Sequence, residues 1–276
     1  MKTFIVIPTY NEAVNLEKLV EQVFALHPDF HILVVDDNSP DGTGDIAEGL
    51  RQKNPHIQVM HRPKKAGLGT AYIEGFKQAL SSGADLIFEM DADFSHDPKY
   101  LKDFLIAMDK ADLVIGSRYI NGVRVEGWRF RRLLLSKFAN MYVSYIMVRP
   151  VWDFTAGFRC YKRAVLESID LDQIKSDGYA FQIEMTHLTF KHGFKVREIP
   201  IVFREREGGY SKIGRNIVWE AFWLTLKCRA PIWEIVKHLS FLFKDYSEFT
   251  NENNSPGKEL SHHRDTESTE KNLHSA

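Results

Sequence analysis

The chain has 276 residues, of which 44% are hydrophobic and 26% are charged. This composition excludes a disordered or fibrous protein and suits one large α/β domain or two small ones. The 36 basic and 37 acidic side chains leave a formal net charge of −1, so no global field favours nucleic acid and an anionic partner must be bound locally.

From the amino terminus, short apolar runs alternate with segments of helical periodicity. Strands are predicted at residues 3–7, 31–35, 57–60, 84–90 and 113–115, and helices at residues 11–24, 41–50, 71–80, 98–108 and 178–192. The first helix is expected to begin from Asn11 as its cap. Apolar strands separated by such helices predict a mostly parallel sheet with helices on both faces. In these sheets, ligands bind beyond the carboxyl ends of the strands.

Polar residues follow four of the predicted strands and are therefore expected at one edge of the sheet. They are Pro8–Glu12, Asp36–Thr43, Asp91–Asp93 and Gly116–Tyr119. A tyrosine ring can stack on a base or sugar, and carboxylates can accept hydrogen bonds from base N–H or ribose hydroxyl groups. Several of these residues also have a purely structural interpretation as turn formers or helix caps.

Asp91 and Asp93 carry the most specific chemistry. Two carboxylates separated by one residue at the end of a buried strand can both reach one hard divalent cation, and such ions bridge carboxylates to substrate phosphates. Two solvated aspartates in a turn are the competing interpretation. Asp37 follows Asp36 directly and needs a donor or a cation to compensate the repulsion. Together these clusters favour a nucleotide diphosphate as the ligand.

Six motifs in chain order resemble those of the dolichyl-phosphate (polyprenyl-phosphate) mannosyltransferases. The motifs are Val6–Glu12, Val34–Thr43, Gly67–Tyr72, Met90–His96, Gly116–Tyr119 and Asp177–Met185, joined by Arg204–Lys212. The resemblance implies the GT-A fold, an α/β fold with a mostly parallel sheet, and inverting glycosyl transfer. We therefore expect a transferase domain at residues 1–215 and amphipathic helices at residues 216–244, while the composition of residues 245–276 predicts a disordered polar tail.

The resemblance also implies roles for individual residues. It assigns the nucleotide-sugar site to Pro8, Tyr10, Glu12, Val35, Asp37, Asp91, Ala92, Asp93, Arg118, Arg206 and Lys212. The first five would line the guanosine, Ala92 would touch ribose or phosphate through its backbone, and Asp91 and Asp93 would hold Mg²⁺ or Mn²⁺. The catalytic residues would be Asp93, Arg118, Arg206 and Lys212. Ser95 stands where some relatives carry a longer amide side chain, which leaves a third protein ligand open.

Glycosyl transfer to a phosphate acceptor requires cations that offset the charge of the two substrates, and it does not require a general base. A polyprenyl phosphate has a second pKa of about 6 and arrives as an anion, whereas a hydroxyl acceptor would need a base. Cations must instead hold two anions together. Arg206 and Lys212 flank a Gly-Gly pair and are interpreted as a phosphate-clamping loop. Further arginines are predicted to supply charge: Arg124, Arg129, Arg131 and Arg132. For Arg129–Arg132 a solvated helix start is the competing interpretation.

Five other residues have two interpretations each. His96 is either a hydrogen-bond partner of the metal carboxylates or a residue at a helix start. Asp153 and Arg159 form either the acceptor side of the pocket or a buried ion pair. Gln182 and Glu184 lie on the last predicted helix and are either structural or directed at the acceptor.

Two apolar segments raise the question of a membrane. Residues 133–148 are shorter than the roughly 20 residues of a spanning helix, and residues 217–243 are interrupted by charges and Pro231. Neither is predicted to be transmembrane, and each is either a helix in the headgroup region or a helix on a soluble core. Only Cys160 and Cys228 are cysteines, and signal-peptide features are absent, so we expect a cytoplasmic protein, peripheral at the cytoplasmic face of a membrane.

We therefore predict metal-dependent, inverting transfer of mannose from GDP-mannose to a polyprenyl (dolichyl) monophosphate, which gives polyprenyl-phosphate-mannose and GDP. Another donor, such as UDP-glucose, is the alternative, and a protein partner is left open. Three other classes fit less well. An aspartyl-phosphate phosphatase needs an acidic pair downstream of Asp91–Asp93, a receiver domain would stop near half this length, and an oxidoreductase needs Gly-x-Gly-x-x-Gly after the first strand.

Overall fold

The computed structural model describes residues 1–205 of the chain. The predictions for Arg206, Lys212, residues 216–244 and residues 245–276 lie outside the described residues. In chain order the elements are β1 (Thr3–Thr9), α1 (Leu16–Leu26), β2 (His31–Asp36), α2 (Thr43–Lys53), β3 (Ile57–His61), α3 (Leu68–Ser81), β4 (Leu86–Glu89), η1 (Pro98–Tyr100), α4 (Leu101–Met108), β5 (Leu113–Ser117), β6 (Val125–Glu126), α5 (Phe130–Met147), β7 (Arg159–Lys162), α6 (Arg163–Ser168), η2 (Leu171–Gln173), α7 (Gly178–Lys191), β8 (Val196–Pro200) and β9 (Phe203–Arg204).

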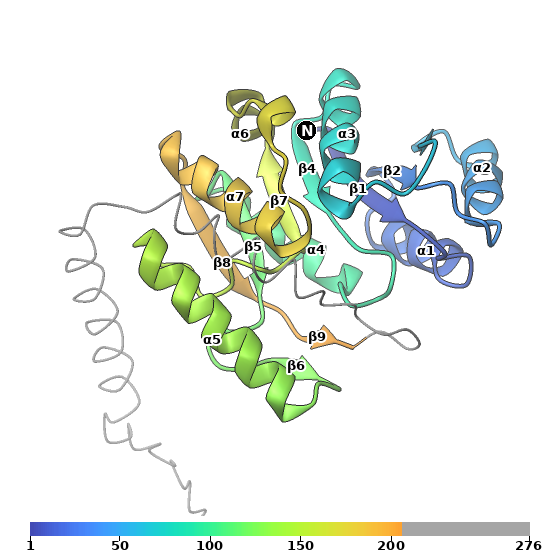
Figure 1. Cartoon of the computed structure of the whole chain (residues 1–276). Coiled ribbons are helices and arrows are strands. Elements are labelled where there is room, and N and C mark those ends of the chain that lie inside the picture. The colour runs from blue at the N-terminus through green and yellow to red at the C-terminus, as the bar shows by residue number, and fades with distance from the viewer. Residues whose placement is uncertain (206–276) are drawn as a thin grey trace, which may run out of the picture.

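Seven strands form one sheet in the order β3-β2-β1-β4-β7-β5-β8 (Figure 1). Neighbouring strands run parallel, except that β7 is antiparallel to both β4 and β5. A separate two-stranded sheet pairs β6 with β9. The prediction of an α/β fold with a mostly parallel sheet is therefore confirmed.

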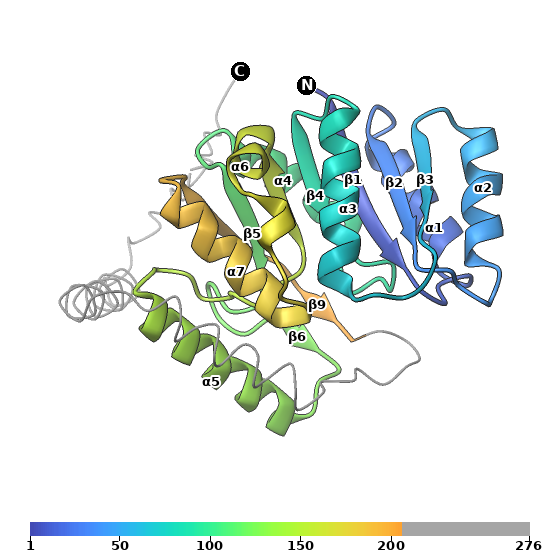
Figure 2. The same ribbon diagram turned by 45° about the horizontal axis from the view of Figure 1, so that its top comes forward.

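Helices cover both faces of the large sheet because successive strand residues point to opposite sides. Phe4 and Val6 of β1 belong to a core that also contains residues of α3, α6 and α7, whereas Ile5 and Ile7 belong to a core with α1, α2 and α4. Figure 2 shows α3 and α7 in front of the sheet and α1 and α4 behind it. Burial on both faces explains why β1 is continuously apolar instead of alternating.

Two strands and one helix start differ from what the sequence predicts. β7 has four residues and includes Arg159 and Lys162, and β8 ends in Pro200, so neither is a continuous apolar run. The prediction that Asn11 caps the first helix is wrong. Its backbone φ of 62° lies in the left-handed region, which does not continue into a right-handed helix, and α1 begins at Leu16.

All but the last residue of the apolar segment 133–148 is helical and forms most of α5, which has 18 residues and ends at Met147. One side of α5 packs into the first core through Val143 and Met147. Across residues 1–205, none of the helices combines the length and the hydropathy of a membrane span. The opposite side of α5 faces solvent, as described below.

The direction in which strands are added to the sheet reverses between β1 and β4. The chain passes from β1 to β2 and β3 on one side and then returns to β4 on the other side of β1. Such a reversal leaves a crevice beyond the carboxyl ends of the two central strands. β1 ends at Thr9 and β4 ends at Glu89, so the residues that follow them, including Tyr10 and Asp91, flank this crevice.

Candidate active site

Two cavities open beyond the carboxyl ends of the strands and share a wall. The β1 cavity, which lies at the end of β1, has a volume of about 230 Å³, and the β5 cavity, which lies at the end of β5, has a volume of about 210 Å³. Leu68, Asp91 and Asp93 line both of them. The two aspartates predicted to bind a metal therefore stand at the junction between two spaces.

The lining of the β1 cavity matches most of the residues predicted to contact the nucleoside and ribose. Those that line it are Pro8, Tyr10, Glu12, Asp37 and Ala92. Val35 instead is fully buried in the first core, so its side chain does not face this cavity. Lys65, which no sequence motif indicated, also lines the cavity and places its Nζ 3.9 Å from the centre of the Tyr10 ring.

The adjacent carboxylates of Asp36 and Asp37 are compensated by different partners. Asp36 Oδ1 accepts hydrogen bonds from Thr9 Oγ1 at 3.0 Å and from Ser39 Oγ at 2.5 Å. Asp37 forms a buried ion pair with Arg62. Burial raises the pKa of the Asp37 carboxyl, and the Arg62 guanidinium opposes this rise. The hydrogen-bond donor that compensates the repulsion between Asp36 and Asp37 is thus Arg62, which follows β3 and belongs to none of the six motifs.

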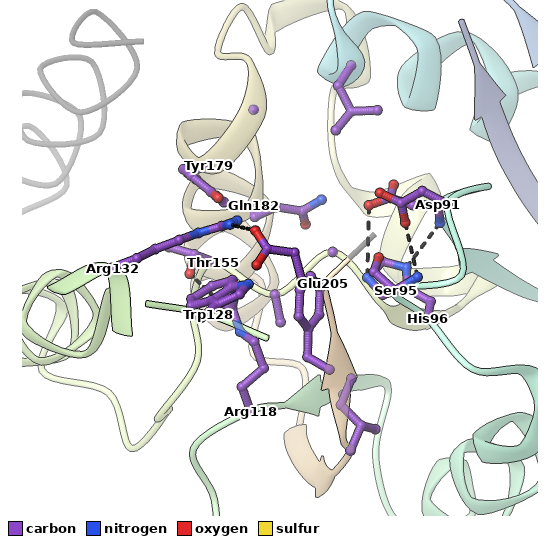
Figure 3. Close-up of a pocket in the computed structure, with 18 residues that line it drawn as sticks. Asp91, Ser95, His96, Arg118, Trp128, Arg132, Thr155, Tyr179, Gln182 and Glu205 are labelled. Atoms are coloured by element: carbon purple, nitrogen blue, oxygen red, sulfur yellow. Dashed lines mark hydrogen bonds and ion pairs between the residues drawn. The ribbon is translucent and has the colours of Figure 1, made fainter. Parts of the chain in front are cut away.

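The segment Asp91–Asp93 is held in place by neighbouring hydrogen-bonding groups. Asp91 Oδ1 accepts a hydrogen bond from the Tyr72 hydroxyl at 3.0 Å, and the Asp91 N–H donates to His96 Nδ1 at 3.0 Å. The Ser95 N–H donates to Asp93 Oδ1 at 3.1 Å. Because Nδ1 of His96 accepts, Nε2 carries the ring proton, 3.9 Å from Asp91 Oδ2. Figure 3 shows His96 and Ser95 beside Asp91, so His96 is a hydrogen-bond partner of this segment.

The donor set at this junction fits a hard divalent cation that takes most of its ligands from substrate and water. Asp91 and Asp93 offer carboxylate oxygens, the ligands that Mg²⁺ and Mn²⁺ prefer. Nowhere in residues 1–205 do three or more His, Cys, Asp or Glu side chains cluster in a way that could hold a metal. Mg²⁺ usually keeps several waters and binds through one or two carboxylates plus phosphates. The metal role of the two aspartates stays a prediction, and a third protein ligand stays open.

Arg118 lies in the wall of the β5 cavity, and its charge is already paired. The residue is 4% exposed, and its guanidinium donates to the two carboxylate oxygens of Asp153 at 2.7 and 2.6 Å and to Thr155 Oγ1 at 2.7 Å. Burial disfavours the charged form, but the attraction of Asp153 outweighs it and raises the pKa of Arg118. A phosphate in this cavity would meet a guanidinium whose charge Asp153 offsets, and the catalytic role of Arg118 stays a prediction.

The suggested ion pair between Asp153 and Arg159 does not form. Asp153 is occupied by Arg118, whereas the Arg159 guanidinium donates to three backbone carbonyl oxygens and one hydroxyl at 2.7–3.0 Å. The carboxyl group that interacts electrostatically with Arg159 is that of Glu89, which lies opposite it on the neighbouring strand β4. Asp153 and Arg159 are close in sequence, but Asp153 pairs with Arg118 and Arg159 interacts with Glu89.

Arg132 and Glu205 both line the β5 cavity and contact each other (Figure 3). Arg132 Nη1 donates to Glu205 Oε1 at 2.5 Å, and the guanidinium carbon lies 4.0 Å from the centre of the Trp128 ring. Of the four further arginines predicted to supply charge, Arg132 lines this cavity. The other three are exposed and line neither cavity: Arg124, Arg129 and Arg131.

Gln182 lines the β5 cavity and also ties α7 to the sheet. Its Nε2 donates to Glu89 Oε2 at 2.6 Å. Burial raises the pKa of Glu89 to about 7, against the effect of Arg159. Glu184 instead accepts a hydrogen bond from Ser176 and lines neither cavity. A charged residue within an apolar strand was the sequence signal that could have identified Glu89.

Comparison with known proteins gives consistent results. The family model described as glycosyl transferase family 2 matches residues 4–170. The chain is 50% identical over 222 residues to the polyprenol monophosphomannose synthase of Mycolicibacterium smegmatis, which covers 80% of this chain and 84% of that protein. It is 44% identical over 221 residues to the undecaprenyl-phosphate mannosyltransferase of Micrococcus luteus, with coverages of 80% and 91%. The crystal structure of glucosyl-3-phosphoglycerate synthase from Mycobacterium tuberculosis with Mn²⁺ and UDP-glucose has the same fold, with a TM-score of 0.62, 16% identity and coverages of 83% and 79%.

Proposed function

Because this chain belongs to glycosyl transferase family 2, and is therefore a glycosyltransferase, we propose that it transfers mannose from GDP-mannose to a polyprenyl monophosphate with inversion and release of GDP. The two relatives, a polyprenol monophosphomannose synthase and an undecaprenyl-phosphate mannosyltransferase, support both the sugar and the lipid phosphate. The family resemblance and the GT-A fold expected from the sequence are confirmed. The phosphatase, receiver and oxidoreductase alternatives are therefore set aside.

The observation that carries the proposal is the meeting of two cavities at Asp91 and Asp93. The β1 cavity offers the Tyr10 ring for stacking on a base or sugar and the carboxylates of Glu12 and Asp37 as hydrogen-bond acceptors, which suits a nucleoside. The β5 cavity contains Arg132, which suits an acceptor phosphate. A donor in the first cavity and an acceptor in the second would meet at the two aspartates.

Asp91 and Asp93 would hold Mg²⁺ or Mn²⁺ on the donor diphosphate, and the bound ion would neutralise charge on the departing GDP. Tyr72 and Ser95 keep the two carboxylates oriented through the hydrogen bonds described above. The Mycobacterium tuberculosis enzyme with the same fold contains Mn²⁺ together with UDP-glucose, which supports a divalent ion as a companion of the nucleotide sugar.

The acceptor needs positioning more than activation. Its phosphate has a second pKa of about 6 and is an anion at neutral pH, so no side chain has to remove a proton. A phosphate oxygen in the β5 cavity attacks the anomeric carbon while the bond to the diphosphate in the β1 cavity breaks, and attack from the opposite side inverts that carbon. Arg206 and Lys212 are proposed to offset the repulsion between the two anions, and Arg132 would contribute where the phosphate replaces Glu205 as its partner.

The assay that tests this proposal offers GDP-mannose or UDP-glucose to the purified full chain with undecaprenyl phosphate in detergent. We expect transfer from GDP-mannose in the presence of Mg²⁺, loss of transfer with excess EDTA, and a product of inverted anomeric configuration by NMR. Turnover with the uridine donor alone would overturn the GDP-mannose assignment. Undiminished turnover in EDTA would overturn the metal assignment.

A lipid acceptor also places the reaction at a membrane surface. We propose that the enzyme is peripheral at the cytoplasmic face of a membrane. The exposed apolar side chains of α5, the helix that also contributes Arg132 to the β5 cavity, support this proposal.

A further inference from the structure

The solvent-facing side of α5 carries an apolar stripe. Of the fourteen exposed large hydrophobic side chains in residues 1–205, six lie on this one helix: Phe130, Leu134, Leu135, Phe138, Met141 and Tyr145. Their exposed fractions range from 43% to 73%. Isolated exposed hydrophobic residues are ordinary on soluble proteins, but a contiguous group of this kind marks an interaction surface.

The stripe is continuous and flanked by positive charge. At 100° per residue, five of the six side chains point within an arc of about 80°, and only Leu135 lies outside it. Lys137 and Arg131, both exposed, project on either side of that arc. The sequence of α5 contains no aspartate or glutamate. Both ribbon views show α5 outside the helical layers that cover the sheet (Figures 1 and 2).

An anionic bilayer fits this surface better than a protein segment does. A helix that buries one side in the core and exposes aromatic and aliphatic residues, bordered by lysine and arginine, on the other can lie in the headgroup region with that exposed side. A second copy of the chain, packed across a two-fold axis, would bring the same cations together. Residues 217–243 of this chain contain two acidic and three Lys or Arg residues, so they offer no net negative charge.

We propose that α5 is the surface by which this protein lies on an anionic bilayer, with the apolar stripe in the headgroup region and Arg131 and Lys137 against lipid phosphates. Arg132 lines the β5 cavity from the same helix. Arg132 projects from the side of α5 opposite the stripe, so contact through α5 would hold the proposed acceptor cavity about one helix diameter, roughly 10 Å, from the headgroup region. The proposal relies on the proposed function only for the identity of the acceptor, since the stripe and its charges do not depend on it.

Vesicle sedimentation of the full-length chain tests this surface. The vesicles are either pure phosphatidylcholine or equal parts phosphatidylcholine and phosphatidylglycerol, without substrate. We expect preferential binding to the anionic vesicles and, for the Phe130→Ser/Phe138→Ser/Met141→Ser variant, a loss of roughly tenfold or more in partitioning. For the Arg131→Glu/Lys137→Glu variant, partitioning onto the anionic vesicles is expected to fall by at least about fivefold for each charge, with no such fall on pure phosphatidylcholine.

Ile106→Ser is the matched control, because Ile106 is 61% exposed but lies on α4. This variant should bind vesicles as the unchanged chain does. Circular dichroism establishes that the variants are folded. Unchanged vesicle binding by the triple serine variant would overturn the proposal, as would a shift of that variant from dimer to monomer in size-exclusion chromatography without any vesicle binding by the parent chain.

Turnover of a short-chain, water-soluble polyprenyl phosphate separates this proposal from the proposed function. The triple serine variant should keep that turnover while losing vesicle binding, because its three side chains do not line either cavity. If the unchanged protein binds vesicles through α5 but transfers no mannose, the proposed function fails alone. If it transfers mannose in solution and binds no anionic vesicles, the α5 proposal fails alone.

Discussion

Asp91 and Asp93 lie in the same turn, but the fold orients them by different means. Asp91 accepts a hydrogen bond from the hydroxyl of buried Tyr72, whereas Asp93 accepts one from the backbone N–H of Ser95. Burial, followed by the negative charge of Asp91, raises the pKa of Tyr72 well above its ordinary value, so that hydroxyl remains a donor. A substitution that keeps an acceptor oxygen at Asp93 can therefore remove charge without disturbing the turn.

Asp93→Asn should reduce metal-dependent transfer by about 10²-fold or more, because one carboxylate charge is lost from the proposed diphosphate site. The amide oxygen can still accept from the Ser95 N–H, so the melting temperature should change little. Turnover as a function of Mg²⁺ concentration, together with thermal melting, measures both effects. Asp103→Asn, at an exposed position on α4, is the matched control. Normal turnover by Asp93→Asn would remove Asp93 from the site.

Asp153→Ala should destabilise the fold by about 3–5 kcal/mol, because it leaves the buried Arg118 guanidinium without its counter-charge. Urea unfolding gives the free energy. Asp172→Ala is the control, since Asp172 forms an exposed ion pair with Lys77, and its loss should matter by no more than about 0.5 kcal/mol. Equal losses in the two variants would contradict the assignment of Asp153 as a buried counter-charge.

The residues that the sequence identified are those that directly follow an apolar strand, because parallel topology gathers such positions at one edge. Tyr10, Asp37 and Asp91 were found in this way. Arg62 and Lys65 were missed, since they lie beyond β3 in a segment without a recognisable pattern. Arg62 and Lys65 contact Asp37 and Tyr10, which follow β2 and β1. No local sequence signal indicates contacts between segments so far apart in the chain.

At the scale of elements, α7 is joined to the centre of the sheet by a buried hydrogen bond between Gln182 and Glu89 of β4. Glu89 is fully buried, and burial raises its pKa to about 7 despite the opposing effect of Arg159. Glu198 of β8 likewise has a pKa raised to about 7 by burial. The central strand β4 and the edge strand β8 therefore each carry a carboxyl group that binds its proton more tightly in the folded chain than in the unfolded one.

The sign of the resulting pH dependence follows from the raised pKa. The stabilisation due to proton binding at Glu89 is complete below the unfolded-state pKa of 4.5 and is lost as the pH rises through about 7. The loss amounts to at most about 3 kcal/mol. Glu89→Gln should therefore flatten the fall in unfolding free energy between about pH 5 and pH 8. Urea unfolding across that range measures the slope.

The matching control for this slope is Glu48→Gln, because Glu48 is a surface carboxyl whose pKa is lowered by its hydrogen bonds to Arg51 and His61. That variant should retain the fall in unfolding free energy. An unchanged slope in Glu89→Gln would mean that Glu89 has an ordinary pKa in the folded protein. Part of the fall should persist in Glu89→Gln, since Glu198 titrates in the same direction.

The elements that the sequence failed to predict are those that owe their place to tertiary partners. β7 is short and polar at both ends, and it is inserted antiparallel between β4 and β5. The Arg159 guanidinium in β7 is satisfied by backbone carbonyl groups from outside the strand. Hydrophobic periodicity cannot indicate a strand that contains a buried arginine held by hydrogen bonds to backbone carbonyl groups.

At the scale of the whole molecule, the sheet is divided at β4 into two functional halves. β1 and β2 end at the cavity that suits the nucleotide, whereas Gly116 of β5 and Phe203 of β9 line the cavity that suits the acceptor. The sequence predicted a mostly parallel sheet but gave no means to order its strands. The order β3-β2-β1-β4-β7-β5-β8 is what brings Asp91 and Asp93 between the two halves.

Binding of the nucleotide should therefore stabilise the whole domain, because the proposed GDP site is built from residues that several strands bring together only in the folded state. A ligand present at a hundredfold its Kd stabilises the native state by about 2.7 kcal/mol. For a domain of this size, that corresponds to a rise in Tm of roughly 5–10 °C. The rise should require GDP and Mg²⁺ together, since the two proposed metal carboxylates line the cavity in which the diphosphate would lie.

Thermal melting of the full chain with GDP and Mg²⁺, with GDP and EDTA, and with UDP and Mg²⁺ separates the contributions of base and metal. The largest rise is expected with GDP and Mg²⁺, and Asp93→Asn should lose most of it, because its neutral amide binds a divalent cation weakly. Equal shifts with and without EDTA would show that the nucleotide binds without the ion. Equal shifts with GDP and UDP would show that the β1 cavity, despite Tyr10, Glu12 and Asp37 in its lining, does not select the base.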